Sequence, residues 1–329
     1  MSTFTERLRR HGGTIGLIVI VLLLDVLALS QAGGSVERQL FVGNVMIQVI
    51  FVGSVGYLYR IVGVASFGQA IFYGGAAYTV GLAAPHVGSS TLLLLIGVGA
   101  ATIAAAVVGL FIFRVPGLSF AILTLALGES LFVLARRERW TGGDTGLFGF
   151  GAGRLFGLDI STPGAFVASM VVFTSLGMLL LWWLEYSRFG VVLRAIRSSD
   201  RRAAALGAGI RTYRYAGFVV AGAVSGVCGS LYALLWNLVS PDILQWSTSG
   251  DPIIMTLIGG MGSIVGPVIG CVAFLYLVDI ASAITDQWEL WVGTILLVVI
   301  LAAPRGVVGL VDDAVSRVLR RKEEAHRVR

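Results

Sequence analysis

Runs of apolar residues occupy most of the chain, and most of them are long enough to cross a bilayer. Because a membrane-spanning helix needs about 20 predominantly apolar residues, the pattern predicts spans near 15–30, 40–59, 62–84, 91–113, 117–135, 165–185, 215–236, 264–284 and 289–303. A further apolar element, Pro252 to Ser263, is too short for an ordinary span and ends in glycines. Counting it as a crossing gives about ten elements. We therefore predict an all-α polytopic membrane protein that includes short or broken helices.

The positions of the basic residues favour a topology with both termini in the cytoplasm. If the N-terminus is cytoplasmic, the inner segments hold 19 of the 24 basic residues and the outer loops hold five. Basic residues concentrate on the cytoplasmic side of membrane proteins, so this count agrees with ten crossings. Without a crossing at 252–263, the basic C-terminal residues would face outward. We predict one transmembrane domain, 1–310, followed by a basic cytoplasmic tail, 311–329.

Composition narrows the classes of function. Hydrophobic residues make up 57% of the chain and charged residues 13%, which is more apolar surface than one soluble core could bury. The only lysine is Lys322, so the chain lacks the Gly-Lys-Ser/Thr loop that cradles nucleotide phosphates. If transport is driven by ATP, hydrolysis takes place in another subunit. The basic residues follow membrane sidedness, so nucleic-acid binding is not predicted, and neither is a metal site.

The segment from residue 189 to 217 interrupts the apolar pattern with six arginines. Residues at spacings of three and four predict the apolar face of one short amphipathic helix: Val192, Ile196, Ser199, Ala203 and Leu206. Gly207 and Gly209 predict its end and a turn toward the next span. A helix of this kind at the cytoplasmic surface suits docking into a partner protein and equally suits contact with anionic lipid.

Four blocks in the chain carry a family resemblance. LRAIRSSDRRAAALGAGIRTYRYAGFVVAGAVSGVCGSLYAL (193–234) resembles the cytoplasmic coupling loop and following span of the M-type permease subunits of branched-chain amino acid ABC importers, the Liv system. The same family is similar to this chain, in the same order, at VASFGQAIFYGGAAYTVGL, at GLSFAILTLALGESLFVL with TGGDTGL, and at SPDILQWSTSGDPIIMTLIGGMGSIVGPVIG with APRGVVGL. Together the blocks cover roughly residues 45 to 310.

The resemblance implies a non-catalytic permease subunit in the bacterial inner membrane. Its expected partners are a homologous permease subunit in a heterodimer, two cytoplasmic ABC ATPases and a periplasmic or lipid-anchored substrate-binding protein, within membrane lipid. ATP and Mg²⁺ would act in the ATPases, and this chain would bind no cofactor. Amide and urea importers share the same blocks, so a urea or amide permease is an alternative. A stand-alone secondary transporter or channel also fits the composition.

The resemblance further assigns ATPase coupling to a loop at about 188–214. The small residues of the family's coupling motif match Ala204, Ala205 and Gly207, whereas Ala203 replaces the expected glutamate and Asp200 lies one turn earlier. We expect the coupling contacts to involve Arg194, Arg197, Asp200, Ala204, Ala205, Leu206 and Gly207.

Other residues are candidates for the translocation path or a gate: Gln69, Thr124, Glu129, Gly259, Gly260 and Gly262. An ionisable residue inside a span is costly to bury, so Glu129 either serves the path or pairs with Arg136 or Arg137. The glycines at 262, 266 and 270, and at 222 and 226, predict ridges of close helix packing.

The TGGDTG segment is predicted to lie outside the membrane. Its glycines supply turns, and the resemblance makes Thr141, Gly142 and Gly143 candidates for facing the substrate-binding protein. A plain turn is the alternative.

Overall fold

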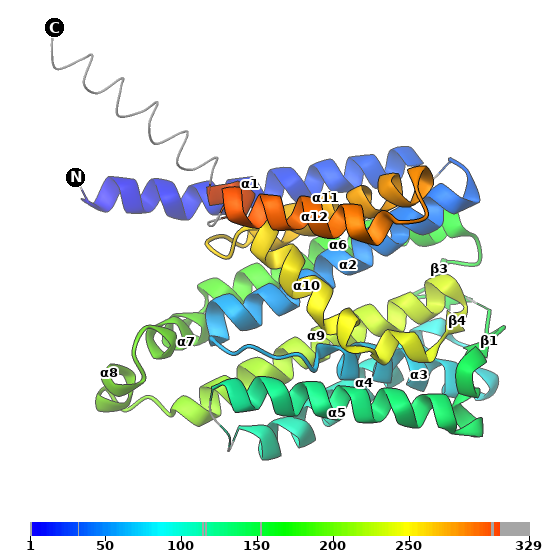
Figure 1. The fold of residues 1–329 in the computed structure, drawn as a ribbon, viewed down its shortest axis with the longest axis horizontal. Coiled ribbons are helices and arrows are strands. Elements are labelled where there is room, and N and C mark those ends of the chain that lie inside the picture. The colour runs from blue at the N-terminus through cyan, green and yellow to red at the C-terminus, as the bar shows by residue number, and fades with distance from the viewer. Residues whose placement is uncertain are drawn as a thin grey trace, which may run out of the picture.

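The computed structural model describes residues 2–31, 33–113, 115, 117–151, 153–303 and 306–309. Helices form nearly all of this part, and most of them lie side by side with their axes along the long dimension of the molecule (Figure 1). The all-α class is therefore confirmed. The basic tail predicted at 311–329 lies outside the described residues, as do Arg114 and Arg305.

Each of the ten predicted crossing elements corresponds to a helix. These helices are α1 (Ser2–Gln31), α2 (Val36–Tyr57), α3 (Gln69–Ala83), α4 (Ser90–Ile112), α5 (Leu118–Arg137), α6 (Pro163–Tyr186), α9 (Ile210–Trp236), α10 (Trp246–Gly259), α11 (Val265–Ile284) and α12 (Trp288–Ala302). Within the described residues, six helices are long and apolar enough to cross a membrane: α2 with the turn that follows it, α4, α5, α6, α9 and α11. The apolar parts of α1, α3, α10 and α12 are shorter.

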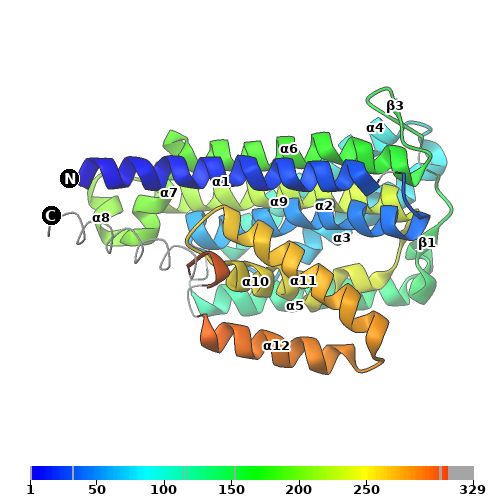
Figure 2. The same cartoon turned by 90° about the horizontal axis from the view of Figure 1, so that it is seen from above.

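The remaining elements lie at the two ends of the bundle or break its helices. Two helices that follow α6, α7 (Arg188–Ser198) and α8 (Asp200–Ala205), lie at the end where the chain begins and where α12 finishes (Figures 1 and 2). Short strands lie at the opposite end, where β1 (Leu147–Phe148) pairs with β4 (Leu238–Val239) and β2 (Arg154–Leu155) pairs with β3 (Leu158–Asp159), both antiparallel. Short turns connect or extend these elements: η1 (Leu58–Val62), η2 (Ala84–His86), η3 (Arg139–Thr141), η4 (Gly143–Thr145) and η5 (Pro241–Leu244).

The centre of the bundle is built on α2 and α9. About three quarters of each apolar window is buried, 78% for α2 and 72% for α9, whereas the windows of α4, α5, α6 and α11 are 22% to 39% buried. The helices around the centre therefore leave broad apolar faces to lipid or to other subunits.

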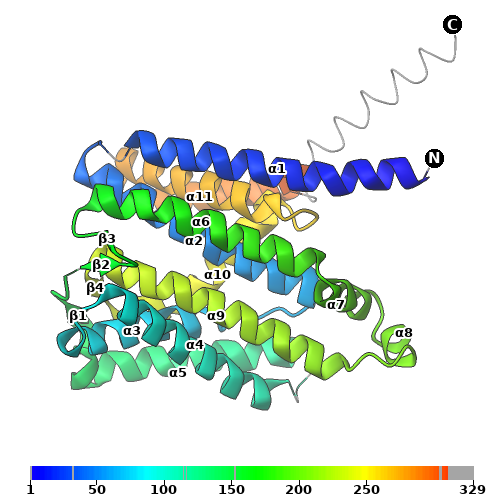
Figure 3. The same cartoon turned by 180° about the vertical axis from the view of Figure 1, so that it is seen from behind.

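Small residues bring α9 close to α4, as the glycine spacing predicts. A Cβ atom added at Gly222 would clash with Ala105 of α4, and one added at Gly226 would clash with Ala101 one turn away. The two helices lie beside each other in the view from behind (Figure 3). Glycine at both positions lets the two backbones approach closely. Such close packing stabilises helix contacts in lipid, where the hydrophobic effect does not drive helices together.

The third predicted span, 62–84, is helical over only part of its length. The chain leaves α2 through the π-helical turn η1, and Gly63 then takes a left-handed conformation with φ of 74°. Residues 63–68 form no helix, and α3 begins at Gln69. Because Gly63 has no Cβ, it can adopt this conformation without steric cost.

The short element predicted at 252–263 is a real helix with shifted bounds. Helix α10 begins six residues earlier, at Trp246, keeps Pro252 inside it and ends at Gly259. Gly260, with φ of 108°, stops it. The glycine-rich break then leads into α11 at Val265.

Candidate functional site

The residues from Val192 to Leu206, predicted to share one helix, lie on two helices, α7 and α8, so that prediction is wrong. The hydroxyl of Ser187 accepts a hydrogen bond from the Gly190 amide at 3.2 Å and caps α7. Ser199 has an extended backbone, with φ of −167° and ψ of 110°, and its hydroxyl accepts a hydrogen bond from the Arg202 amide at 3.4 Å. Serine at this position favours a helix start, which divides the segment.

The break also changes which residues form the apolar face. Leu193 and Ile196 of α7 are fully buried, and Ala203 of α8 is 3% exposed. Leu206, expected on the same face, is instead 87% exposed. α7 therefore packs onto the bundle, whereas the end of α8 projects away from it.

Four charged side chains fasten α7 to the bundle. Arg60 of η1 donates two hydrogen bonds to the carboxylate oxygens of Glu185, near the end of α6, both at 2.6 Å. Arg194 donates to the backbone carbonyl of Glu185 at 2.5 Å, and Arg197 donates to the carbonyl of Arg60. The Arg60 and Glu185 side chains are only 9% and 8% exposed. We call these four residues the anchor cluster.

The anchor cluster adjoins the irregular segment before α3. A Cβ atom at Gly63 would lie within 3 Å of the Arg197 side chain, so Arg197 packs directly against the first residue of that segment. α7 is thus connected through one arginine to residues 63–68 and, through them, to the start of α3.

Four of the seven residues expected to touch a partner lie at the end of α8, whereas Arg194 and Arg197 lie on α7, within the anchor cluster. Ala204, Ala205, Leu206 and Gly207 are all exposed, and Gly207 has φ of 81°. Asp200, the first residue of α8, connects this helix to α9. Its carboxylate accepts two hydrogen bonds from Arg214 of α9, at 2.9 and 3.0 Å. Asp200 therefore already has a partner within the chain.

Gln69, a pathway candidate, lies deep in the bundle. It is fully buried, and its side-chain oxygen accepts a hydrogen bond from the Ser225 hydroxyl of α9 at 3.0 Å. The Ser225 hydroxyl lies 3.3 Å from that of Ser54 on α2. The side-chain nitrogen of Gln69 has no hydrogen-bond partner among the described residues. Three helices thus place polar groups together in an otherwise apolar interior.

Side chains from α5 and α10 bind the backbone at the start of α3. The Thr124 hydroxyl, a second pathway candidate, accepts a hydrogen bond from the Phe67 amide at 3.1 Å. The Ser249 hydroxyl of α10 accepts one from the Ala70 amide at 2.8 Å. These bonds satisfy amides that a helix start inside the bundle leaves without helical partners.

Glu129 makes neither of the arginine pairs considered from the sequence. Arg136 pairs instead with Asp144, at 2.6 Å, in the turn that follows α5. The Glu129 carboxylate accepts a hydrogen bond from the amide of Trp246, the first residue of α10, at 2.9 Å. A carboxylate at a helix N-terminus is favoured by the helix dipole, so Glu129 links α5 to α10.

The three pathway glycines differ in their surroundings. Gly259 and Gly266 bring α10 and α11 into backbone contact, because a Cβ atom at Gly259 would meet the Gly266 carbonyl. Gly260 supplies the positive φ that ends α10. A Cβ atom added at Gly262 would have no neighbour within 4 Å, so the ridge expected at 262, 266 and 270 packs only through its last two members.

In the turn that follows α5, Thr141 is buried and Gly142 and Gly143 are partly exposed. The Thr141 hydroxyl donates to the carbonyls of Ala135 and Glu138, both at 2.6 Å, and the side chain is 3% exposed. Gly142 and Gly143 have φ of 83° and 58°. Thr141 thus closes the end of α5, and the two glycines provide the turn conformations predicted for them.

Sequence patterns alone did not indicate several of these residues. Arg60 and Glu185 lie 125 positions apart at the edges of two spans, and no local pattern links them. Ser225 is a small hydroxyl residue in an apolar run, and Ser249 is one of three consecutive hydroxyl residues. The only sequence signal for Arg60 and Glu185 is that each is a charged residue next to an apolar span. A charge that becomes buried there requires a partner.

The architecture defines a class, a polytopic α-helical membrane protein with interrupted helices inside the bundle and a projecting helical turn at one end. Residues 39–303 match the family described as "Branched-chain amino acid transport system / permease component". The chain belongs to this family.

Individual relatives agree with the family match. The chain is 25% identical over 288 residues to the high-affinity branched-chain amino acid transport system permease protein LivM of Escherichia coli strain K12 and, equally, to that of Salmonella typhimurium. Each alignment covers 80% of this chain and 68% of the relative. A shorter match, 34% identical over 82 residues, links 25% of the chain to 24% of the nucleoside ABC transporter permease protein NupC of Lactococcus lactis. No solved structure matches the chain.

Proposed function

We propose that this chain is the transmembrane subunit of an ATP-driven importer for branched-chain or related hydrophobic amino acids, and that it docks to separate ATPase subunits through α7 and α8. The observation that carries the proposal is the exposed tip around Leu206, connected through α7 to the buried anchor cluster. An exposed leucine beside small residues is suited to a partner's groove.

The anchor cluster gives a route for motion. A force on α8 reaches Arg194 and Arg197 of α7, which hold the carbonyls of Glu185 and Arg60. Arg197 also packs against Gly63, where the irregular segment before α3 begins. Movement of α7 would therefore shift both the end of α6 and the chain that leads to Gln69.

The path for the substrate would lie where α3 and α10 begin. Gln69, Thr124 and Glu129 meet the starts of these helices, and such broken helices inside a bundle are the usual setting of transporter sites. The glycine break after α10, at Gly259 and Gly260, gives that helix a joint at which to move.

We also propose the other subunits of the importer, on the basis of family membership. They are a homologous permease subunit that forms a heterodimer with this chain, two ATPases that use ATP and Mg²⁺, and a periplasmic or lipid-anchored binding protein. The chain itself would be non-catalytic, and both of its termini would be cytoplasmic in a bacterial inner membrane. Gly142 and Gly143, at the opposite end, are the proposed contacts of the binding protein.

Reconstitution tests this proposal. The chain would be co-expressed with its candidate partners, purified through a tag on this chain and placed in vesicles with ATP inside or outside. The proposal predicts co-purified ATPases and ATP-dependent leucine uptake that isoleucine and valine inhibit. Urea, an amide and a nucleoside serve as competitors that should not inhibit. Uptake by this chain alone, without ATP, would identify a stand-alone carrier instead.

A further inference from the structure

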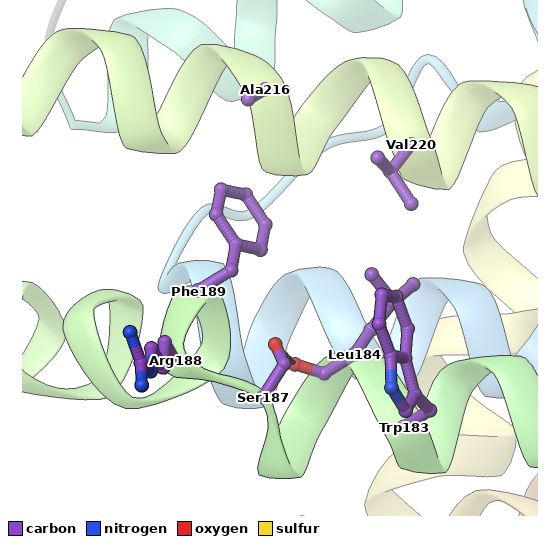
Figure 4. Close-up of a pocket in the computed structure, with 7 residues that line it drawn as sticks. All are labelled: Trp183, Leu184, Ser187, Arg188, Phe189, Ala216 and Val220. Atoms are coloured by element: carbon purple, nitrogen blue, oxygen red, sulfur yellow. Dashed lines mark hydrogen bonds between the residues drawn. The ribbon is translucent and has the colours of Figure 1, made fainter.

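An apolar groove of about 510 Å³ separates the junction of α6 and α7 from α9. Trp183, Leu184 and Ser187 line it from the α6 side, Arg188 and Phe189 from the first turn of α7, and Ala216 and Val220 from α9 across the gap (Figure 4). Its size is within the range of about 300 to 1,000 Å³ that is common for ligand pockets. Nearly all of its surface is carbon.

Aromatic side chains shape the groove. The Phe189 ring points into the gap between α7 and α9 (Figure 4) and stacks on Tyr213 of α9 with a centroid distance of 5.6 Å. Trp183 on α6 is 59% exposed. Tryptophan rings favour the interfacial zone of a bilayer, which places this groove at the depth where headgroups meet acyl chains.

A cation lies at the rim of the groove. Arg188 is exposed and makes no hydrogen bond or ion pair in the described part of the chain. The nearby Ser187 hydroxyl is occupied, because it donates to the Leu184 carbonyl and accepts from the Gly190 amide. Arg188 is thus a charged group that remains available to a ligand, and guanidinium groups bind phosphate oxygens well.

We propose that the groove binds an acyl chain of an anionic phospholipid, with the lipid phosphate on Arg188. The combination of a carbon-lined groove and an unpaired guanidinium at its rim matches the two parts of such a lipid. A helix from another subunit is the alternative occupant, and the experiment below distinguishes it from lipid. The proposal concerns binding and does not depend on the substrate or on ATPase docking.

The experiment uses the full-length chain in nanodiscs with phosphatidylglycerol that carries a diazirine on one acyl chain. After illumination, cross-linked peptides are identified by mass spectrometry. The proposal predicts labelling of the peptides that contain Trp183, Phe189 and Val220. Unlabelled phosphatidylglycerol should compete, and phosphatidylcholine should compete less well.

Two changes separate the parts of the site. Val220→Trp fills the groove and should reduce groove labelling strongly, whereas Leu179→Trp, on an α6 position that is 56% exposed outside the groove, should not. Arg188→Gln should weaken phosphatidylglycerol binding about fivefold, as expected for one basic residue near anionic lipid. Arg201→Gln on exposed α8 is the charge-matched control. Size-exclusion profiles and membrane abundance report folding for each variant.

Any of three outcomes would overturn the proposal. One is labelling of the groove peptides that Val220→Trp leaves unchanged in a variant that folds normally. Another is equal labelling by phosphatidylglycerol and phosphatidylcholine, unaffected by Arg188→Gln. Cross-links from the groove to a second permease subunit in the assembled complex, in place of lipid, would also contradict it.

Discussion

The side chains of Arg60 and Glu185 form a two-pronged ion pair inside the bundle, with both nitrogen-to-oxygen distances at 2.6 Å. Arg60 lies in the turn that follows α2, and Glu185 lies near the end of α6, just before α7 begins. Because both side chains are almost completely buried, each needs the other to offset its loss of hydration. The pair therefore fixes the position from which α7 and α8 project.

Removal of one partner should destabilise the protein severely. Glu185→Ala leaves the Arg60 guanidinium buried without a counter-charge, which typically costs about 3–5 kcal/mol. The thermal unfolding of the purified protein in detergent, followed by tryptophan fluorescence, should shift to clearly lower temperature. The double change Arg60→Met with Glu185→Leu should recover much of that loss, since an apolar pair needs no hydration.

The matched control for this prediction is the exposed pair at the other end of the bundle. Asp144→Ala breaks its ion pair with Arg136, whose side chain is 52% exposed, and should change the unfolding temperature little. An unchanged unfolding temperature for Glu185→Ala would contradict the role given to the anchor cluster.

Leu206 should matter for partner binding but not for folding. Its side chain is 87% exposed at the end of α8, so Leu206→Asp removes no packing within the chain. We predict wild-type abundance and unfolding temperature, with a loss of ATPase co-purification and of ATP-dependent uptake. Leu158→Asp, at an exposed position on β3 at the opposite end, should leave co-purification intact.

Single arginine changes near the tip should be milder than Leu206→Asp. Arg201 lies on exposed α8, and exposed charge contacts contribute only about 0–1 kcal/mol. Gly207 is a less clean probe, because its φ of 81° strains any larger residue even before a partner is met. If Arg201→Ala abolished co-purification while Leu206→Asp preserved it, the docking surface would have to be reassigned.

Substitutions at Glu129 distinguish a requirement for its negative charge from a requirement for its hydrogen bond to the start of α10. Glu129→Gln keeps an oxygen that can accept the hydrogen bond from the Trp246 amide, whereas Glu129→Leu removes it. Loss of a helix cap typically costs about 0.5–2 kcal/mol. We expect Glu129→Leu to lower membrane abundance and uptake together, and Glu129→Gln to retain most of both. Abolished uptake at normal abundance for Glu129→Gln would show that transport requires the charge itself.

The contact between α9 and α4 can be tested by a reciprocal exchange. Gly226→Ala places a Cβ atom against that of Ala101 and should destabilise the protein by about 1–3 kcal/mol through overpacking. Adding Ala101→Gly should restore most of the stability. Gly99→Ala is the control, because no atom lies within 4 Å of its added Cβ. Equal unfolding temperatures for Gly226→Ala and Gly99→Ala would contradict the close packing.

Features that repeat along the chain, such as apolar length and glycine spacing, could be predicted from the sequence. Contacts between residues that are distant in the sequence could not. Apolar length predicted α1 to α6, α9, α11 and α12, because hydrophobic thickness constrains every span in the same way. Glycine spacing predicted the approach at Gly222 and Gly226, since small residues four apart share one helix face. The span predicted over 62–84 includes residues 63–68, which form no helix, and Gly63, Ser66 and Gly68 are the only local signals of that break.

Sequence patterns singled out candidate pathway residues but did not indicate the contacts that these residues make. Gln69 is the first residue of α3, and Thr124 and Glu129 lie on α5. Their hydrogen-bond partners Ser225, Phe67 and Trp246 are far away in the sequence. Likewise, the periodicity over 192–206 ignores the capping preference of Ser199, which divides the helix.

The most direct test of the central claim is site-directed cross-linking from the tip of α8 in the assembled importer. Leu206→Cys would be introduced after replacement of the free, buried Cys228 and Cys271, in a background shown to retain uptake. A membrane-impermeant maleimide should label Leu206→Cys in inside-out vesicles but not in intact cells. Co-expressed ATPases should protect it, and a short bifunctional reagent should join it to an ATPase subunit. Labelling from outside intact cells, or labelling that the ATPases do not change and no cross-link to them, would contradict the account.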